Sequence, residues 1–141
     1  MEKEGSILET EEIRSLIYTI RGKHIMLDSD VARLYHYETK RINETVKRNI
    51  KRFPKSFCFQ LEDNELENLR SQIATSSLKD NNYGGKRYLP YVFTEQGVAM
   101  LSGLLKNDIA IQVSINIINA YEKKSSKISR RILLSITRRR I

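Results

Sequence analysis

The chain has 141 residues and a formal net charge of +8, with a sequence isoelectric point near 9.7. Its 40% hydrophobic and 30% charged residues are typical of a folded soluble protein and exclude a chain that is disordered throughout. The excess of cations favours a polyanionic partner, because a basic surface attracts phosphate groups and releases their counterions.

The cysteine content and the first residues of the sequence indicate the cellular compartment in which we expect the protein. Cys58 is the one cysteine, which excludes an internal disulfide. The first residues lack the basic-then-apolar order of a signal peptide. No segment reaches the about 18 uninterrupted apolar residues of a membrane-spanning helix. We therefore expect a cytoplasmic protein without membrane association.

The charges divide the chain into three parts. The acidic N-terminal segment, 1–12, carries five glutamates, whereas the last nineteen residues of the basic C-terminal tail, 122–141, hold eight Lys or Arg and no acid. Residues 13–121 between them have the pattern of one folded domain. A second basic block runs from Lys40 to Lys55 inside that domain.

The domain begins with an expected hairpin and two helices. Apolar residues in 13–20 and 24–27 flank Gly22, which indicates a short hairpin. Asp28 can cap a short helix that ends near Tyr35. A longer helix is predicted over 39–50, with an apolar stripe at Ile42, Val46 and Ile50.

Short strands and further helices follow. Residues 57–61 have the composition of a strand, and Asp63 can cap a helix that contains Leu66, Leu69 and Ile73. The small polar residues and paired glycines of 74–87 predict a surface loop. A strand is expected over 88–93, with Pro90 at an edge or end position. Thr94 can cap the next helix, in which the small residues Gly97, Ala99 and Gly103 allow close approach.

The segment 109–121 gives conflicting signals. Isoleucine and valine alternate with mostly polar residues, as in a strand, but Ile111, Ile115 and Ile118 also have helical spacing. We expect a helix here, because no breaker separates the segment from the residues that follow. The serine- and arginine-rich tail after Lys124 is expected to be a flexible arm, to which an amphipathic turn or two could be added by Ile132, Leu133, Leu134 and Ile136. The predicted fold class is therefore α+β, with a helix-turn-helix-like pair packed with a small antiparallel sheet and C-terminal helices.

The predicted helix pair has the features of a helix-turn-helix over 28–50. Ala32 is small enough for a close helix crossing, and the turn at His36 must do without the glycine that often lies there. If the apolar stripe is buried, helical geometry directs other side chains outward, where a major groove could admit the helix. The candidate base readers are Thr39, Lys40, Asn43, Glu44 and Lys47. The candidate phosphate contacts are Arg48, Lys51 and Arg52, together with Lys86 and Arg87 in a basic wing.

The helix pair could also have a purely structural role, and the titratable side chains raise the question of catalysis. The pair could be an amphipathic structural element with a solvated basic face, as charge runs often are. Catalysis is not expected: His24, His36 and Cys58 lack the spacing of zinc ligands, and Glu95 is explained by the dipole of the helix it begins. We expect neither a metal nor a cofactor.

Four blocks of sequence carry a family resemblance. They cover residues 20–35, 38–44, 47–54 and 87–102, and the ordered match extends over roughly 13–121. Together they resemble the ORF-six N-terminal domain family, which is similar to the KilA-N and Bro-N domains of phages and large DNA viruses. The resemblance implies an α+β DNA-binding domain of phages, prophages and mobile elements, whose members act as antirepressors or transcriptional regulators.

We therefore expect residues 13–121 to form a DNA-binding domain of this type, with double-stranded DNA as the partner and the basic tail adding non-specific affinity. A homodimer is a further expectation, because paired modules read paired half-sites. The alternative is a protein–protein interaction module that binds a repressor through the apolar segment 109–121, without sequence-specific DNA readout.

Overall fold

The structure is a computed structural model that describes residues 9–72 and 89–140, and from residue 126 on it describes the backbone alone. The helices are α1 (Thr10–Arg14), α2 (Asp28–Tyr35), α3 (Thr39–Arg48), the 3-10 helix η1 (Ile50–Arg52), α4 (Asp63–Gln72), α6 (Glu95–Ser102) and α7 (Ala110–Arg140). The strands are β1 (Tyr18–Ile20), β2 (Lys23–Leu27), β3 (Cys58–Gln60) and β4 (Tyr91–Phe93). The α+β class is confirmed, and the expected loop over 74–87 lies outside the described residues.

The N-terminal hairpin forms where it was predicted. β1 and β2 pair antiparallel, with Ile20 opposite Lys23. The two residues between them, Arg21 and Gly22, have φ angles of 56° and 73°, as a tight hairpin turn of mirror-image type requires. The short helix α1 that precedes the hairpin was not anticipated.

The four strands form one antiparallel sheet in the order β1-β2-β4-β3. Side chains alternate between its two faces. In β2, Met26 joins the core on one face, whereas Ile25 and Leu27 join the core on the other. In β4, Phe93 and Val92 divide in the same way. The expected strand 88–93 is shorter than predicted, and Pro90 directly precedes it.

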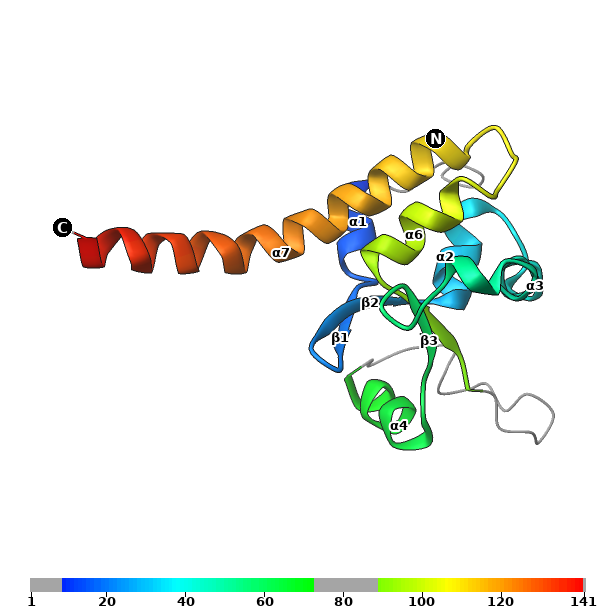
Figure 1. The fold of residues 1–141 in the computed structure, drawn as a ribbon, viewed down its shortest axis with the longest axis horizontal. Coiled ribbons are helices and arrows are strands. Elements are labelled where there is room, and N and C mark those ends of the chain that lie inside the picture. Colours follow the sequence, from blue (N-terminus) through cyan, green and yellow to red (C-terminus); the bar gives the residue numbers. More distant parts are fainter. Residues whose placement is uncertain (1–8, 73–88, 141) are drawn as a thin grey trace.

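Helices cover both faces of this sheet (Figure 1). The larger core holds buried side chains of α1, α2, α3, α6 and α7. The smaller core lies under α4, whose Leu66 and Leu69 pack with sheet residues. The helix pair α2–α3 therefore belongs to the larger helical layer.

The start of α6 confirms two predictions. The Thr94 hydroxyl accepts a hydrogen bond from the Gly97 amide at 3.3 Å, so Thr94 is the N-cap. It also donates to the Ser56 carbonyl at 2.8 Å. A Cβ atom at Gly97 would lie 2.0 Å from the Phe57 carbonyl oxygen. Only glycine lets the segment before β3 approach α6 this closely.

Segment 109–121 is helical from Ala110 on, as we expected, and forms the first part of α7. The helix continues without interruption through the tail that was expected to be a flexible arm, so that expectation is wrong for the described backbone. Figure 1 shows its C-terminal half projecting from the rest of the chain. In the part of the chain that the structure describes, no helix is both long and apolar enough to cross a bilayer.

Replacing Gly97 with alanine should destabilise the protein by about 2 kcal/mol or more, because the new methyl group collides with backbone rather than with a flexible side chain. Gly103→Ala is the control, since a Cβ there meets its nearest atom at 3.7 Å. Urea unfolding checks both variants. Equal stability of the two would contradict the close approach at Gly97.

Candidate nucleic-acid interface

The candidate interface is built on the pair α2–α3. The turn between the helices places His36 at a φ angle of 62°. The Tyr37 amide donates to the Ala32 carbonyl at 2.8 Å, and the His36 amide donates to the Arg33 carbonyl at 3.1 Å. These bonds are those of a helix terminus that normally prefers glycine. Of the two residues that could hold the turn in place of a glycine, His36 and Tyr37, it is His36 that adopts the left-handed conformation.

The side chains predicted to join the two helices are buried. Val31, Ala32 and Tyr35 of α2 are at most 1% exposed, and Ile42 and Val46 of α3 are at most 4% exposed. The prediction for Ile50 is wrong. α3 ends at Arg48, and Ile50 lies in η1 with 60% of its surface exposed.

A row of cations occupies the outer side of this pair. We call it the basic face and define it by six exposed residues of α3 and η1: Lys40, Arg41, Lys47, Arg48, Lys51 and Arg52. None of the six pairs with a carboxylate in the described part of the chain, where the ion pairs involve cations of other elements. Unpaired cations on a solvent-facing helix are available to an external anion.

The structure places the predicted contact residues in different settings. Lys40, Lys47, Arg48, Lys51 and Arg52 are all exposed, whereas Thr39 and Glu44 are half-buried. Lys86 and Arg87 lie outside the described residues.

Arg41 also belongs to the basic face, although the sequence did not identify it as a candidate contact. Arg41 lies seven positions before Arg48, which puts both on one side of the helix. Its guanidinium lies 5.4 Å from the centre of the Tyr37 ring, within the range of a cation–π contact. The spacing from Arg48 was the signal that could have identified it.

The expectation that Asn43 points outward is wrong. Its side-chain amide donates to Oδ2 of Asp28 at 3.0 Å. The same oxygen accepts the backbone amide of Tyr91 at 3.2 Å. Asp28 is 0% exposed and is the first residue of α2. One buried carboxylate thus joins the start of α2, the middle of α3 and the start of β4.

The other end of α2 is tied to α7. The Ser114 hydroxyl donates to the Ala110 carbonyl, so the Tyr35 hydroxyl is the donor in its bond to Ser114. Burial raises the pKa of Tyr35 to about 12, which keeps this donor protonated. The Asn107 side chain donates to the Tyr35 carbonyl at 2.8 Å. These contacts hold the helix pair against the larger core.

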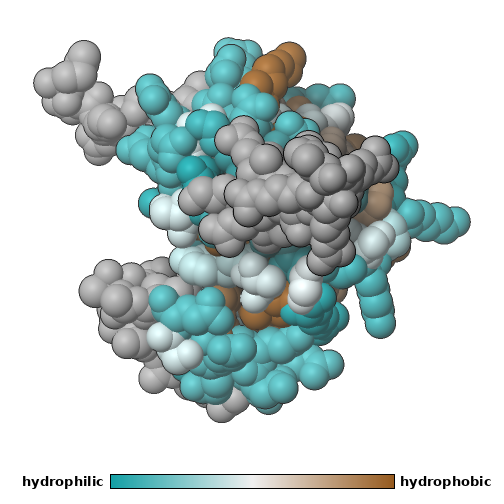
Figure 2. All heavy atoms as spheres, turned by 90° about the vertical axis from the view of Figure 1, so that its left-hand side faces the viewer, coloured by the Kyte–Doolittle hydropathy of each residue, from teal (hydrophilic) through white to brown (hydrophobic). Residues whose placement is uncertain are grey.

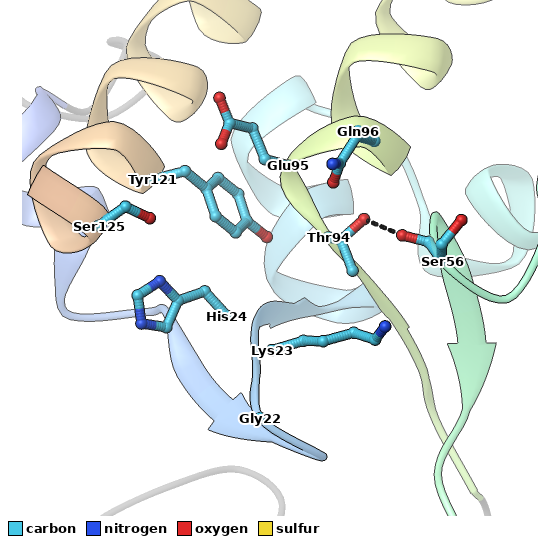
Figure 3. Close-up of a pocket in the computed structure, with 9 residues that line it drawn as sticks. All are labelled: Gly22, Lys23, His24, Ser56, Thr94, Glu95, Gln96, Tyr121 and Ser125. Carbon is cyan, nitrogen blue, oxygen red and sulfur yellow. Dashed lines mark hydrogen bonds between the residues drawn. The ribbon is translucent and has the colours of Figure 1, made fainter. Parts of the chain in front are cut away.

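A hollow of about 480 Å³ lies among the hairpin, the start of α6 and α7 (Figure 3). Two buried residues that line it use their hydroxyls within the protein: Thr94 donates to the Ser56 carbonyl, and Tyr121 donates to the Phe93 carbonyl at 2.6 Å. Burial and the nearby charge of Lys124 lower the pKa of His24. Burial and Glu122 raise the pKa of Glu95. The hollow is therefore a gap between secondary-structure elements, and its buried hydroxyls stabilise the fold.

The potential metal ligands and the single thiol do not form a reactive site in the described part of the chain. Among the described residues, no group of three His, Cys, Asp or Glu side chains is arranged to hold a metal ion. Cys58 is 6% exposed, and burial, with a smaller contribution from the charge of Asp28, raises the pKa of its thiol to about 12. The thiol is therefore a protonated core group rather than a nucleophile.

A double-mutant cycle with Asp28→Ala and Asn43→Ala tests the buried link. Each single change should lower the free energy of unfolding, and the double variant should lose about 1 kcal/mol less than the sum, because both remove one hydrogen bond. Denaturant unfolding measures the four proteins. Asp28→Ala combined with Lys40→Ala is the control and should be additive; additivity of the first pair would show that the link contributes nothing.

A comparison with family models identifies the family of the chain. A family model described as the ORF6N domain matches residues 15–104, which is more than half of the chain. The match runs from β1 to α6 and so includes the helix pair and the sheet. Neither the curated proteins nor the solved structures that were compared gave a match. The chain belongs to the ORF6N domain family.

Proposed function

We propose that the protein is a DNA-binding transcriptional regulator of the kind that phages and mobile elements carry, and that its basic face contacts duplex DNA. The observation that supports this proposal is the row of six exposed, unpaired cations on α3 and η1. Cations placed along a helix neutralise successive phosphates and release their counterions, which supplies sequence-independent affinity.

The placement of α3 favours duplex DNA over a small anion. An α-helix with its side chains is about 10–12 Å wide and fits the major groove, which is about 12 Å wide. Lys40 and Lys47 lie two turns apart on one side of α3, so both can face the same groove. Lys51 and Arg52 continue the row beyond the end of the helix, where phosphates of the backbone are in reach.

Base readout is assigned to fewer residues than the sequence suggested. Asn43 is engaged with Asp28, so we leave it out of the proposed readers. Lys40 and Lys47 are exposed and can bond the acceptors of guanine, with half-buried Thr39 and Glu44 at the margin of the face. Arg41, Arg48, Lys51 and Arg52 are proposed to contact phosphates.

The C-terminal part of α7 adds a second source of attraction. No acid follows Glu122 in the sequence, while eight Lys or Arg do. This part of the helix projects from the core (Figure 1). We propose that it binds DNA without regard to sequence and so raises the affinity for all duplexes alike.

Lys47→Ala should weaken binding to a random-sequence duplex by about fivefold near 0.1 M salt and should reduce the slope of log affinity against log salt by about 0.9, because on a duplex without the preferred bases each cation of the basic face neutralises a phosphate and one of these cations is removed. Adding Lys40→Ala should reduce the slope again by a similar amount. Fluorescence anisotropy over a salt series measures both quantities.

Lys23→Ala is the matched control, because it removes one exposed lysine from the hairpin. If it weakens binding as much as Lys47→Ala, affinity comes from net charge and the basic face is not the contact surface. Weak binding that is insensitive to salt would instead favour the competing function, an antirepressor that grips a repressor protein through apolar contacts.

A further inference from the structure

In the part of the chain that the structure describes, two arginines lie over aromatic rings. The Arg21 guanidinium lies 4.2 Å from the centre of the Phe59 ring, and it also donates to the Glu65 carboxylate at 2.6 Å. The Arg41 guanidinium lies over the Tyr37 ring at 5.4 Å, but no carboxylate pairs with it among the described residues. Arg41 is therefore held by a ring while its N–H donors stay available to an external acceptor.

A polar, solvated surface alone does not distinguish α3 from the rest of the molecule. Figure 2 shows the side from which the C-terminal part of α7 projects, and the described residues on it are mostly hydrophilic. An exposed lysine or arginine samples many rotamers, and binding to an anion must restrict them. The Tyr37 ring reduces this cost for Arg41, because it already restricts where the guanidinium lies.

The Tyr37 ring is itself held by the connection between α6 and α7. Its hydroxyl accepts a hydrogen bond from the Lys106 backbone amide at 3.4 Å. The neighbouring Asn107 side chain donates to the Tyr35 carbonyl at 2.8 Å, so the turn before α3 is bonded twice to this connection. Tyr37 is also half-buried and packs against the larger core. The ring is thus a fixed support that lies two residues before α3 begins.

We propose that Tyr37 is a positioning residue of the basic face, whose ring orients the Arg41 guanidinium toward a DNA phosphate. This role rests on the proposed function, since it requires that the basic face contacts DNA. A guanidinium that stacks on a ring uses the face of its plane, whereas a phosphate accepts from the N–H groups at its edge. Both contacts can therefore form together. Arg41 and Arg48 lie on one side of α3, so the oriented guanidinium extends the row of phosphate contacts toward the start of the helix.

Proton NMR of the DNA-free protein tests the contact itself. The ring current of Tyr37 should shift the side-chain resonances of Arg41, because the guanidinium lies over the ring. Tyr37→Leu should abolish this shift. Tyr37→Phe should retain it, since the ring remains although the hydroxyl that bonds to Lys106 is lost. Arg41 resonances that are the same in Tyr37→Leu and in the wild type would overturn the proposal.

Fluorescence anisotropy with a random-sequence duplex over a salt series tests what the contact does for binding. Tyr37→Leu should weaken binding about threefold and leave the slope of log affinity against log salt unchanged, because the phosphate contact still forms but from a less ordered side chain. Tyr37→Phe should restore most of the lost affinity. Arg41→Ala should reduce the slope by about 0.9, and Tyr37→Leu should then cause no further loss.

Lys47→Ala is the matched background, because Lys47 lies over no ring in the described chain, and there Tyr37→Leu should again weaken binding about threefold. If Tyr37 only stabilised the fold, Tyr37→Leu would displace α3, lower the slope by more than about 0.9 and weaken Arg41→Ala as well. That result, or equal affinity of the wild type and Tyr37→Leu, would overturn the positioning role and leave the proposed function in place. A wild type that does not bind the duplex would overturn both.

Discussion

The position of the basic helix depends on one buried carboxylate. Asp28 has no exposed surface, and a buried carboxylate is costly unless hydrogen-bond donors surround it. Its donors come from two other parts of the chain, the side chain of Asn43 and the backbone of Tyr91. The need to satisfy this group therefore fixes α3 against both α2 and the sheet. Apolar packing alone would tolerate more sliding of one helix on another.

The long helix α7 supplies the second constraint. It packs against α1 and α6, and Tyr121 bonds to β4 while Tyr35 of α2 bonds to Ser114. The helix pair is thus held at the start of α2 by the sheet and at its end by α7. A contact surface is most precise when rigid elements position it. This support explains how an exposed row of cations keeps one geometry although its own side chains make few contacts within the protein.

Periodicity and turn chemistry predicted most of the fold. Helical spacing identified the stripe of Ile42 and Val46, and small or capping residues identified the close approach at Gly97 and the start of α6 at Thr94. The role of Asn43 could not be predicted, because its partner Asp28 is distant in sequence and becomes buried only when the sheet forms. Ile50 continued the stripe by spacing, but α3 ends before it. The uninterrupted helix α7 was not predicted, because the serines and arginines in its C-terminal part are typical of flexible arms.

A titration of the ¹⁵N-labelled protein with a short duplex of random sequence, followed by amide chemical shifts, tests the central claim most directly. If the basic face contacts DNA, the largest shift changes should fall on residues 39–52, with smaller changes on the C-terminal part of α7, and the hairpin 18–27 should stay unchanged. Changes confined to the hairpin and α4, or no changes at low salt, would contradict the assignment of the basic face as the DNA contact surface.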